Sequence, residues 1–376
     1  MVGGHPEAIT RVVGFAISSD KAKKHLRAEL LRRAEAVHIK IVAIDPSKPV
    51  AEQGPFDLIL QKCRDEGWRQ RLVEYVAQHP QTKLIDSFDS VQSLMTRGST
   101  GRYWFMTTQH HLPVLGRSIG SLVSLSCYTA CTHQKPEAQL IYCAGCTEEE
   151  ASQIIDDADI RFPLLAKPYY TDGRQGSHGL ALVEDIGGLM RLVRGTGPPG
   201  IALPVMLQPF IEHGGCLFKV YVMGSSIAVV HRPSLQLPPE DADVTAQRKG
   251  IQTMTRISAF HSTSPMGCKF VEGPPDWLLH QLAAALRTAL NLQLFNFDLM
   301  RPTERNAPGS KGADFLVVDI NYFPGYEKLP NHAALMVDFL QSLLKPAAEQ
   351  GPAKEQGTQV QRHLSSCLDD AGSDSE

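Results

Sequence analysis

Short apolar runs alternate with polar, helix-forming segments through the first 95 residues, and this alternation constrains the fold more than any other feature. The apolar runs cover residues 11–17, 39–44, 56–60 and 83–86, and residues 21–33 and 68–79 between them suit helices. Strands that alternate with helices are typical of a parallel sheet covered by helices. We therefore expect residues 1–95 to form one α/β domain.

The rest of the chain predicts strands and helices in a less regular order. Strands are expected at residues 162–167, 180–183, 204–211, 217–222, 227–230, 294–300 and 315–320, and helices at 148–157, 185–193, 277–290 and 333–344. Residues 100–150 show no clear period before the helix at 148, and residues 236–265 suit a long surface loop. The polar tail beyond residue 345 is expected to be disordered.

The balance of charge excludes several functional classes. The chain has 37 basic and 40 acidic side chains and a formal net charge of −3, so no overall field attracts nucleic acid or a membrane, and an anion site must be a local pocket. Residues 1–10 lack the profile of a secretory signal, and no apolar run approaches the ~20 residues of a membrane span. We expect a soluble cytoplasmic protein, with the nucleus as a further compartment.

Two late strands carry a set of oxygen ligands. Asp298 lies on the strand at 294–300, and Asp319 and Asn321 lie on and just after the strand at 315–320. Because side chains alternate between the faces of a strand, Asp319 and Asn321 point the same way, and Asp298 on an adjacent strand can meet them. Two carboxylates and an amide oxygen suit Mg²⁺. The alternative is that these strand-end residues only cap turns.

A lysine followed by a glycine-rich loop predicts a phosphate-binding element. Lys167 ends an apolar strand, and residues 171–179 contain three glycines with small and polar neighbours. A lysine on a rigid strand can neutralise phosphates, and small residues let backbone amides approach a phosphate chain. The loop lacks the ending of a P-loop and the spacing of a dinucleotide fingerprint, so an ordinary hairpin loop is the alternative interpretation.

Six further side chains could meet a phosphorylated substrate. They are Lys21, Lys62, Arg97, His178, Lys219 and Arg232. Taken singly, such groups are usually solvated surface charges. Lys219 and Arg232 differ, because both lie within an apolar hairpin, where a cation usually has an anion to meet.

Five segments occur together in a fixed order and spacing: residues 53–62, 214–222, 232–235, 294–298 and 318–326, with the sequences QGPFDLILQK, GGCLFKVYV, RPSL, LFNFD and VDINYFPGY. The set closely resembles the inositol-tetrakisphosphate 1-kinase family, also called inositol 1,3,4-trisphosphate 5/6-kinases, and residues 321–325 are most similar to its plant branch. The resemblance covers residues 11–99 and 160–345. It implies an α/β protein with the ATP-grasp fold and an N-terminal Rossmann-like domain.

The resemblance also implies a domain order. Residues 1–95 would be an N-terminal domain that binds inositol phosphate, residues 96–215 a central ATP-grasp domain, residues 216–345 a C-terminal ATP-grasp domain with the metal site, and residues 346–376 a disordered tail. Residues 100–150 are atypical of the family, and a shifted reading frame over this segment would explain the change in composition. The segment holds Cys127, Cys131, Cys143 and Cys146, which suit either free thiols or a zinc site.

Roles at matching positions follow from the resemblance. Asp298, Asp319 and Asn321 would hold two Mg²⁺ ions. ATP would contact Arg97, Lys167, Gln208, Lys219 and Ser234. The inositol phosphate would face Lys21, His178, Lys219, Asn321 and Gly325, with Lys62 and Arg232 added because of their charge. His178 and Lys219 are the candidate catalytic residues.

The implied activity is an ATP- and Mg²⁺-dependent transfer of phosphate to inositol tris- or tetrakisphosphates, as in inositol 3,4,5,6-tetrakisphosphate 1-kinases and inositol 1,3,4-trisphosphate 5/6-kinases. Such transfer depends on positioning and charge neutralisation rather than on covalent chemistry by the protein. We expect a monomer that binds neither nucleic acid nor membranes. Two alternatives stay open: another ATP-grasp enzyme that ligates a carboxylate to an amine, and a degenerate family member that binds inositol phosphate without transferring phosphate.

Overall fold

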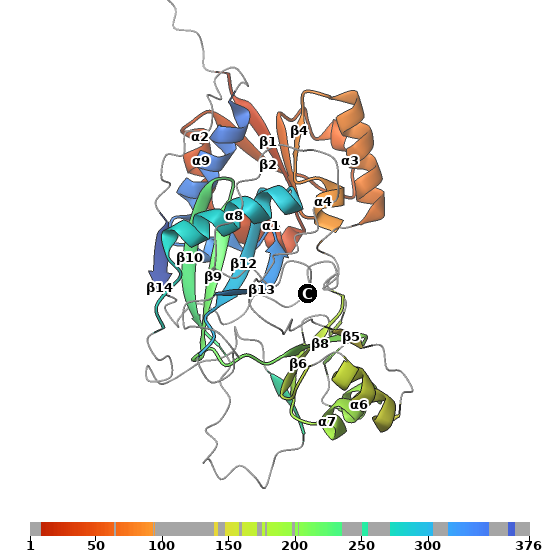
Figure 1. The fold of residues 1–376 in the computed structure, drawn as a ribbon. Helices are drawn as coiled ribbons and strands as arrows, with labels where there is room; N and C mark the ends of the chain where they lie inside the picture. The colour runs from red at the N-terminus through yellow and green to blue at the C-terminus, as the bar shows by residue number, and fades with distance from the viewer. Residues whose placement is uncertain are drawn as a thin grey trace, which may run out of the picture.

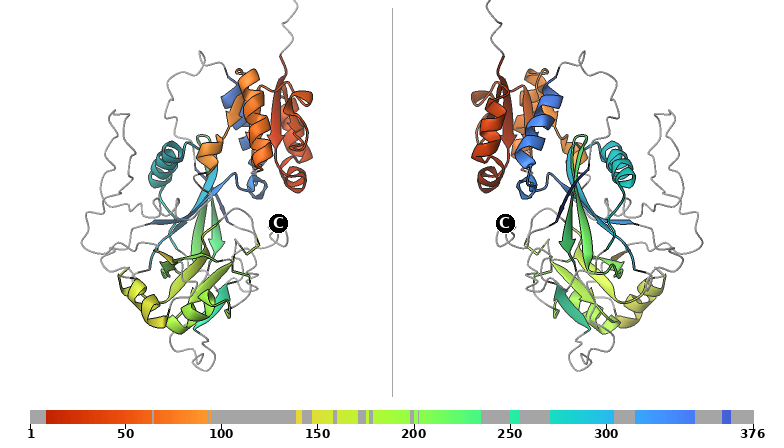
Figure 2. Two further views of the ribbon diagram at one scale, coloured as in Figure 1. Left: turned by 90° about the vertical axis from the view of Figure 1, so that its right-hand side faces the viewer. Right: turned by 90° about the vertical axis from the view of Figure 1, so that its left-hand side faces the viewer.

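The computed structural model describes residues 9–63, 65–92, 94, 139–141, 147–157, 160–170, 175–176, 179–197, 200–201, 203–234, 250–254, 271–303, 315–345 and 360–364. The described strands form three sheets (Figure 1). In side view the N-terminal sheet lies at one end of the molecule, and the two other sheets follow it in turn (Figure 2). None of the described helices is both long enough and apolar enough to span a bilayer.

The N-terminal sheet is parallel, as the alternating pattern predicted. Its order is β2 (Ile39–Ala43), β1 (Arg11–Ala16), β3 (Leu58–Gln61) and β4 (Lys83–Ile85). The helices of this region are α1 (Ser19–His25), α2 (Ala28–Glu35), α3 (Glu66–Gln78) and α4 (Phe88–Gln92). The basic segment expected as one helix is therefore two, because the chain leaves helical geometry at Leu26 and Arg27.

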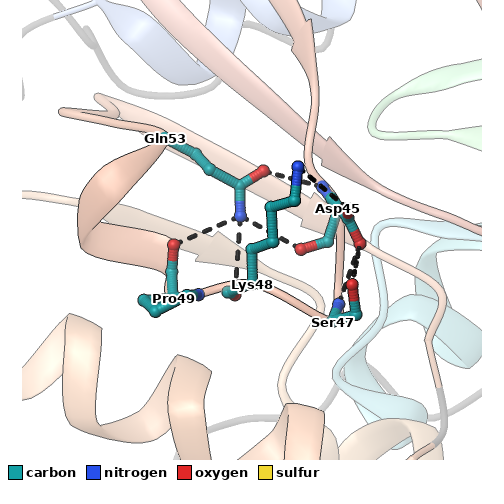
Figure 3. Close-up of polar contacts among 5 residues, drawn as sticks. All are labelled: Asp45, Ser47, Lys48, Pro49 and Gln53. Atoms are coloured by element: carbon teal, nitrogen blue, oxygen red, sulfur yellow. Dashed lines mark hydrogen bonds and ion pairs between the residues drawn. The ribbon is translucent and has the colours of Figure 1, made fainter.

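One glutamine organises the loop that follows β2. The side chain of Gln53 accepts a hydrogen bond from the Asp45 amide at 2.8 Å and donates to the carbonyl oxygens of Asp45 and Pro49 at 3.0 and 3.2 Å (Figure 3). The Asp45 carboxylate accepts bonds from the backbone amide and hydroxyl of Ser47, which lower the pKa of Asp45. Gln53 begins the QGPFD motif, so the first residue of that motif shapes the loop leading into β3.

The second sheet is antiparallel throughout. Its order is β11 (Ile251–Met254), β7 (Leu180–Val183), β6 (Leu164–Pro168), β8 (Val205–Pro209) and β5 (Gln139–Ile141). Helices α6 (Glu148–Asp157) and α7 (Ile186–Val193) pack against one another beside this sheet, and their apolar faces share a core with it (Figure 1).

The third sheet carries both late strands of the sequence. Its order is β13 (Leu316–Tyr322), β12 (Leu294–Met300), β9 (Cys216–Met223), β10 (Ser226–Pro233) and β14 (Gln361–Leu364). Helix α8 (Asp276–Leu290) packs on the face of the sheet that holds Phe295, Phe297 and Leu299. Helix α9 (His332–Leu344) packs instead against α2, so a late segment of the chain completes the N-terminal domain (Figure 1).

Two expectations about irregular segments are wrong. Residues 236–265 were expected to be a loop, yet β11 lies within them and pairs with β7. The tail beyond residue 345 was expected to be disordered, yet β14 lies within it and pairs in parallel with β10. Both are edge strands of four residues, and the backbone groups of an existing strand, rather than an apolar pattern of their own, place them.

Buried polar groups join the N-terminal domain to the third sheet. The hydroxyl of Tyr322, at the end of β13, donates to the Gln61 carbonyl oxygen at 2.6 Å and accepts from the Asp86 amide at 3.3 Å. The carboxylate of Asp86 accepts bonds from the amides of Gln293 and Leu294, where β12 begins, at 2.8 and 3.2 Å. Asp86 is 3% exposed, so this junction replaces water with fixed protein donors.

Asp86 should make the stability of the junction depend on pH. Burial raises the pKa of Asp86 to about 7, despite the two backbone hydrogen bonds that lower it. The same carboxyl titrates near 4 in an unfolded chain, so the folded protein retains a proton that the unfolded chain loses, and stability falls as pH rises through this range. We expect the wild type to lose on the order of 2 kcal/mol relative to Asp86→Asn between about pH 5 and pH 8, measured by urea unfolding. A difference that is constant over this range would contradict the assignment.

Candidate active site

One face of the third sheet gathers the predicted metal ligands. Asp298 on β12 lies directly opposite Lys219 on β9 and directly opposite Asp319 on β13. Asn321 follows two residues after Asp319, so it lies on the same face, and its Nδ2 donates to Asp319 Oδ2 at 3.0 Å. The structure therefore brings Asp298, Asp319, Asn321 and Lys219 together, as the alternation of strand side chains predicted.

Asp298 is the electrostatic centre of this face. Its Oδ1 lies 3.6 Å from Lys219 Nζ, and the two side chains are 18% and 20% exposed. Burial raises the pKa of Asp298, Lys219 opposes that increase most strongly, and the neighbouring Asp319 carboxylate adds to it. Arg232 and Lys167 also lower this pKa, so both predicted cations act on the same carboxylate.

Lys167 reaches this face from a different sheet. It lies at the end of β6, is 6% exposed, and its Nζ donates to the Val318 carbonyl oxygen on β13 at 3.4 Å. The site is thus built between the second and third sheets, with cations from β6, β9 and β10 around one carboxylate pair.

The donor set fits Mg²⁺. Asp298 Oδ1 is buried and has no hydrogen-bond partner among the described residues, which is the state expected of an oxygen that a cation would satisfy. The Asn321 amide nitrogen donates to Asp319, so its amide oxygen is the atom that can act as a ligand. Within the described part of the chain no three His, Cys, Asp or Glu side chains gather as a metal site, because the third ligand here is an amide. Hard oxygen ligands of this kind suit Mg²⁺.

An apolar patch adjoins the carboxylates on one side. It consists of Leu217, Met300, Leu316 and Val318, with Ile211 packed against it. Gln208 lies on β8, three residues before Ile211 in the sequence, and its side chain is buried, with 7% exposed. An apolar surface beside fixed polar groups is the usual lining of a small-molecule pocket. Sequence reasoning did not single out this patch, because its residues come from three strands and a loop.

On the other side of the carboxylates the chain makes a strained turn. Phe323 has φ +40°, which a bulky residue rarely adopts. Its amide donates to the Leu294 carbonyl oxygen at 2.9 Å, and its own carbonyl oxygen accepts from Lys62 Nζ at 2.6 Å. The Lys62 ammonium also lies 5.7 Å from the centre of the Phe323 ring. Lys62 was predicted to contact substrate, and in this structure it ties the N-terminal domain to this turn.

A buried histidine and a buried glutamate lie side by side under the same turn. His25 Nδ1, at the end of α1, lies 3.3 Å from Glu327 Oε2, and the side chains are 7% and 10% exposed. The His25 ring also packs against Phe323, with 5.6 Å between ring centres. Gly325 leaves room for the carboxylate, since a Cβ there would lie 2.6 Å from Glu327 Oε1. His25 and Glu327 are thus positioning residues for Gly325, and no sequence pattern singled them out.

Ser234 is held by a histidine. His213 Nδ1 lies 2.7 Å from the Ile211 carbonyl oxygen, and His213 Nε2 lies 2.8 Å from the Ser234 hydroxyl. Burial lowers the pKa of His213, which favours the neutral ring. A carbonyl oxygen can only accept, so Nδ1 carries the proton and the Ser234 hydroxyl donates to Nε2. The predicted contact of Ser234 with ATP stays a prediction, and its hydroxyl proton is already committed.

Several predicted residues cannot be placed. Arg97 and His178 lie outside the described residues, as do the four cysteines between 127 and 146, and of Lys21 only the backbone, within α1, is described. Their roles toward ATP, inositol phosphate or zinc therefore stay predictions.

The architecture is that of an ATP-grasp protein. A RimK domain ATP-grasp protein from Sphaerobacter thermophilus superposes with a TM-score of 0.50 at 17% identity, over 88% of this chain and 99% of that one. Residues 136–342 match the inositol 1,3,4-trisphosphate 5/6-kinase ATP-grasp domain, and residues 12–91 match the pre-ATP-grasp domain of the same family.

Whole-chain relatives agree with the domain matches. The chain is 34% identical over 340 residues to inositol-tetrakisphosphate 1-kinase 1 of Oryza sativa subsp. indica, covering 89% of this chain and 85% of the relative. It is 32% identical over 354 residues to inositol-tetrakisphosphate 1-kinase 1 of Zea mays, covering 92% of each. The chain belongs to the inositol 1,3,4-trisphosphate 5/6-kinase family. The resemblance to this family, the ATP-grasp fold and the kinase class are thereby confirmed.

Binding of Mg²⁺ should weaken as pH falls, at values where an ordinary aspartate stays ionised. A protonated carboxyl does not bind a cation, and burial raises the pKa of Asp298. Lys219→Met removes the charge that lowers this pKa most, so we expect its loss of Mg²⁺ affinity to begin at higher pH than in the wild type. Isothermal titration calorimetry over a pH series measures both curves. Identical pH dependence in the two proteins would show that Lys219 does not control the ionisation of Asp298.

Proposed function

We propose that this chain uses ATP and Mg²⁺ to phosphorylate an inositol tris- or tetrakisphosphate. The observation that carries the proposal is the group of Asp298, Asp319 and Asn321 on one sheet face, surrounded by Lys167, Lys219 and Arg232. Family membership supports an inositol phosphate as the acceptor, since the relatives are named inositol-tetrakisphosphate 1-kinases. The site supplies the two requirements of the reaction, which are cation binding and cancellation of negative charge.

The donor side of the site is the apolar patch around Met300. An adenine ring is flat and apolar on its faces and would fit against Leu217, Met300 and Leu316, and Gln208, buried on β8, is assigned to polar contact with it. Lys167, between this patch and the carboxylates, then meets the phosphates that follow the nucleoside. The order along β12, from the apolar Met300 to the charged Asp298, matches the order of base and phosphates in ATP.

Bound Mg²⁺ would neutralise and align phosphate oxygens, and Asp298, Asp319 and Asn321 are the residues that would hold it. A pair of ions, as in the family, is part of the proposal. Lys219 and Arg232 reduce repulsion between the two polyanionic reactants, because both lie within reach of Asp298. No described side chain is placed as a general base, which suits a transfer that depends mainly on alignment.

The acceptor side of the site is the turn after β13. Asn321 is exposed, and Gly325 follows four residues later, directly before the 3-10 helix Tyr326–Lys328. Lys62 and the pair of His25 and Glu327 fix this turn from the N-terminal domain. Lys21 and His178 are proposed to complete the acceptor site. A monomeric state and a cytoplasmic location are likewise proposals that rest on sequence.

Two rival functions make different predictions. An ATP-grasp ligase would need an amine and a carboxylate as substrates, whereas the cations here favour a polyanionic acceptor. A degenerate member would bind inositol phosphate without consuming ATP. Incubation with ATP, Mg²⁺ and a panel of inositol phosphates, followed by chromatography of the products, separates all three.

Asp319→Ala should abolish transfer. Removing one of two carboxylate ligands weakens Mg²⁺ binding and the charge neutralisation that depends on it, so we expect kcat/KM to fall by about 10³-fold or more. Asp338→Ala, an exposed position on α9, is the matched control and should keep wild-type activity. Transfer that survives Asp319→Ala would overturn the metal assignment, and product formation by neither variant nor wild type would favour the degenerate alternative.

A further inference from the structure

One carboxamide beside the proposed metal ligands has no hydrogen-bond partner among the described residues. Asn296 lies on β12 two residues before Asp298, opposite Asn321 on β13 and opposite Tyr221 on β9. The residue is 0% exposed, and within the described part of the chain neither its Nδ2 nor its Oδ1 has a hydrogen-bond partner. By alternation, its side chain lies on the same face as Asp298, whereas Phe295 and Phe297 face the core under α8.

Burying a carboxamide without a hydrogen-bond partner raises the free energy of the folded state, unless a ligand or a water molecule supplies the missing hydrogen bonds. More than 90% of buried polar groups in native proteins are hydrogen-bonded, and an unpaired buried amide loses its interactions with water without compensation. An apolar residue of similar size would fit this strand better, because its other buried neighbours on β12 are apolar. A carboxamide that the fold does not use is therefore a candidate for contact with a ligand.

The position of Asn296 identifies which ligand it faces. Met300, Asp298 and Asn296 follow one another at two-residue steps along β12, on the face that forms the site. Each step is roughly 7 Å, so Asn296 lies about that far from the metal ligand, on the side away from the apolar patch. Its cross-strand neighbour Asn321 leads into the turn that carries Gly325. Asn296 thus belongs to the acceptor side.

We propose that Asn296 is a further acceptor-binding residue. A carboxamide has two donors and an acceptor, so it can donate to a phosphate oxygen and accept from the neighbouring hydroxyl of the same ring. An inositol phosphate presents such hydroxyl–phosphate pairs, whereas the nucleoside of ATP lies on the other side of Asp298. This inference rests on the proposed function and adds a specificity-determining contact to it. Because the group is closed off from bulk solvent, the cover over it must shift when the acceptor binds.

Asn296→Leu separates ligand contact from a structural role. Leucine keeps the size and removes the unpaired amide, so we expect the variant to unfold at the same temperature as the wild type or a higher one. The KM for inositol 1,3,4-trisphosphate should rise about 10- to 100-fold, the effect of losing hydrogen bonds to a charged ligand. The KM for ATP should change less than about twofold, because the nucleoside lies beyond Asp298.

Two further variants test whether the effect on KM comes from the chemistry of the Asn296 side chain. Asn296→Asp keeps the shape, replaces the donor with an acceptor and adds negative charge beside a phosphate, so its KM for the acceptor should rise more than that of Asn296→Leu. Phe297→Leu lies on the same strand but faces the core, and it should lower the unfolding temperature while leaving both KM values near those of the wild type.

The possible results separate failure of this inference from failure of the proposed function. An unchanged KM for the inositol phosphate in Asn296→Leu, with wild-type transfer intact, overturns this inference and leaves the proposed function standing. A shift in the Mg²⁺ concentration needed for activity, without a change in acceptor KM, assigns the carboxamide to a metal-bound water and also overturns it. If the wild type neither binds inositol 1,3,4-trisphosphate in calorimetry nor phosphorylates it, the proposed function fails and this inference fails with it.

Discussion

A carboxylate held among three cations sets the requirements for the rest of the structure. Asp298 is largely buried, and burial alone would favour its neutral form. Lys219, Arg232 and Lys167 oppose that effect, yet they come from β9, β10 and β6, and the last of these strands belongs to a different sheet. The charge state of one residue therefore depends on two sheets being held at a fixed separation. The bond from Lys167 to the Val318 carbonyl oxygen is one contact that fixes it.

The N-terminal domain is held to the adjoining end of the third sheet by polar contacts rather than by apolar packing alone. Tyr322 and Asp86 connect the ends of β3 and β4 to the start of β12 and the end of β13. Lys62 adds a bond to Phe323, the residue that follows β13. All of these contacts lie near the turn after β13, which is the proposed acceptor side, and none of them involves the apolar patch. Under the proposed function, movement of the N-terminal domain would disturb acceptor binding before nucleotide binding.

Sequence reasoning predicted the elements in which apolar and polar residues repeat with the spacing of a strand or a helix, or in which turn residues mark the ends. The parallel N-terminal sheet, the β9–β10 hairpin and the shared face of Asp298 and Asp319 all follow from alternation or from turn residues. The short edge strands β11 and β14 did not, because pairing with a neighbour rather than an internal pattern creates them. The break between α1 and α2 was also missed, since no glycine or proline marks it.

For the site, sequence reasoning identified residue types but not their surroundings. Asp298, Asp319 and Asn321 could be grouped because strand geometry relates them, whereas Lys167 lies far from Asp298 in the sequence, and only the family resemblance linked the two. His213, Glu327 and Asn296 were not selected, because a single polar residue in an apolar segment carries no periodic signal. Their significance comes from burial and from partners, and both depend on tertiary structure.

The turn after β13, on the proposed acceptor side, has an unusual backbone conformation. Among the described residues, His38 and Asn291 also have positive φ, at +58° and +52°. His38 lies in the turn between α2 and β2, and Asn291 ends α8, where asparagine tolerates that conformation. Phe323 has no comparable reason for φ +40°, and its conformation is held by Lys62, by the Leu294 carbonyl oxygen and by a fully buried ring. Strain that only the surrounding structure maintains tends to occur where function requires a particular geometry. The strained Phe323, the Asn296 side chain with no hydrogen-bond partner among the described residues and the raised pKa of Asp298 occur on two adjacent strands and the turn that follows them, which favours a functional role for this region.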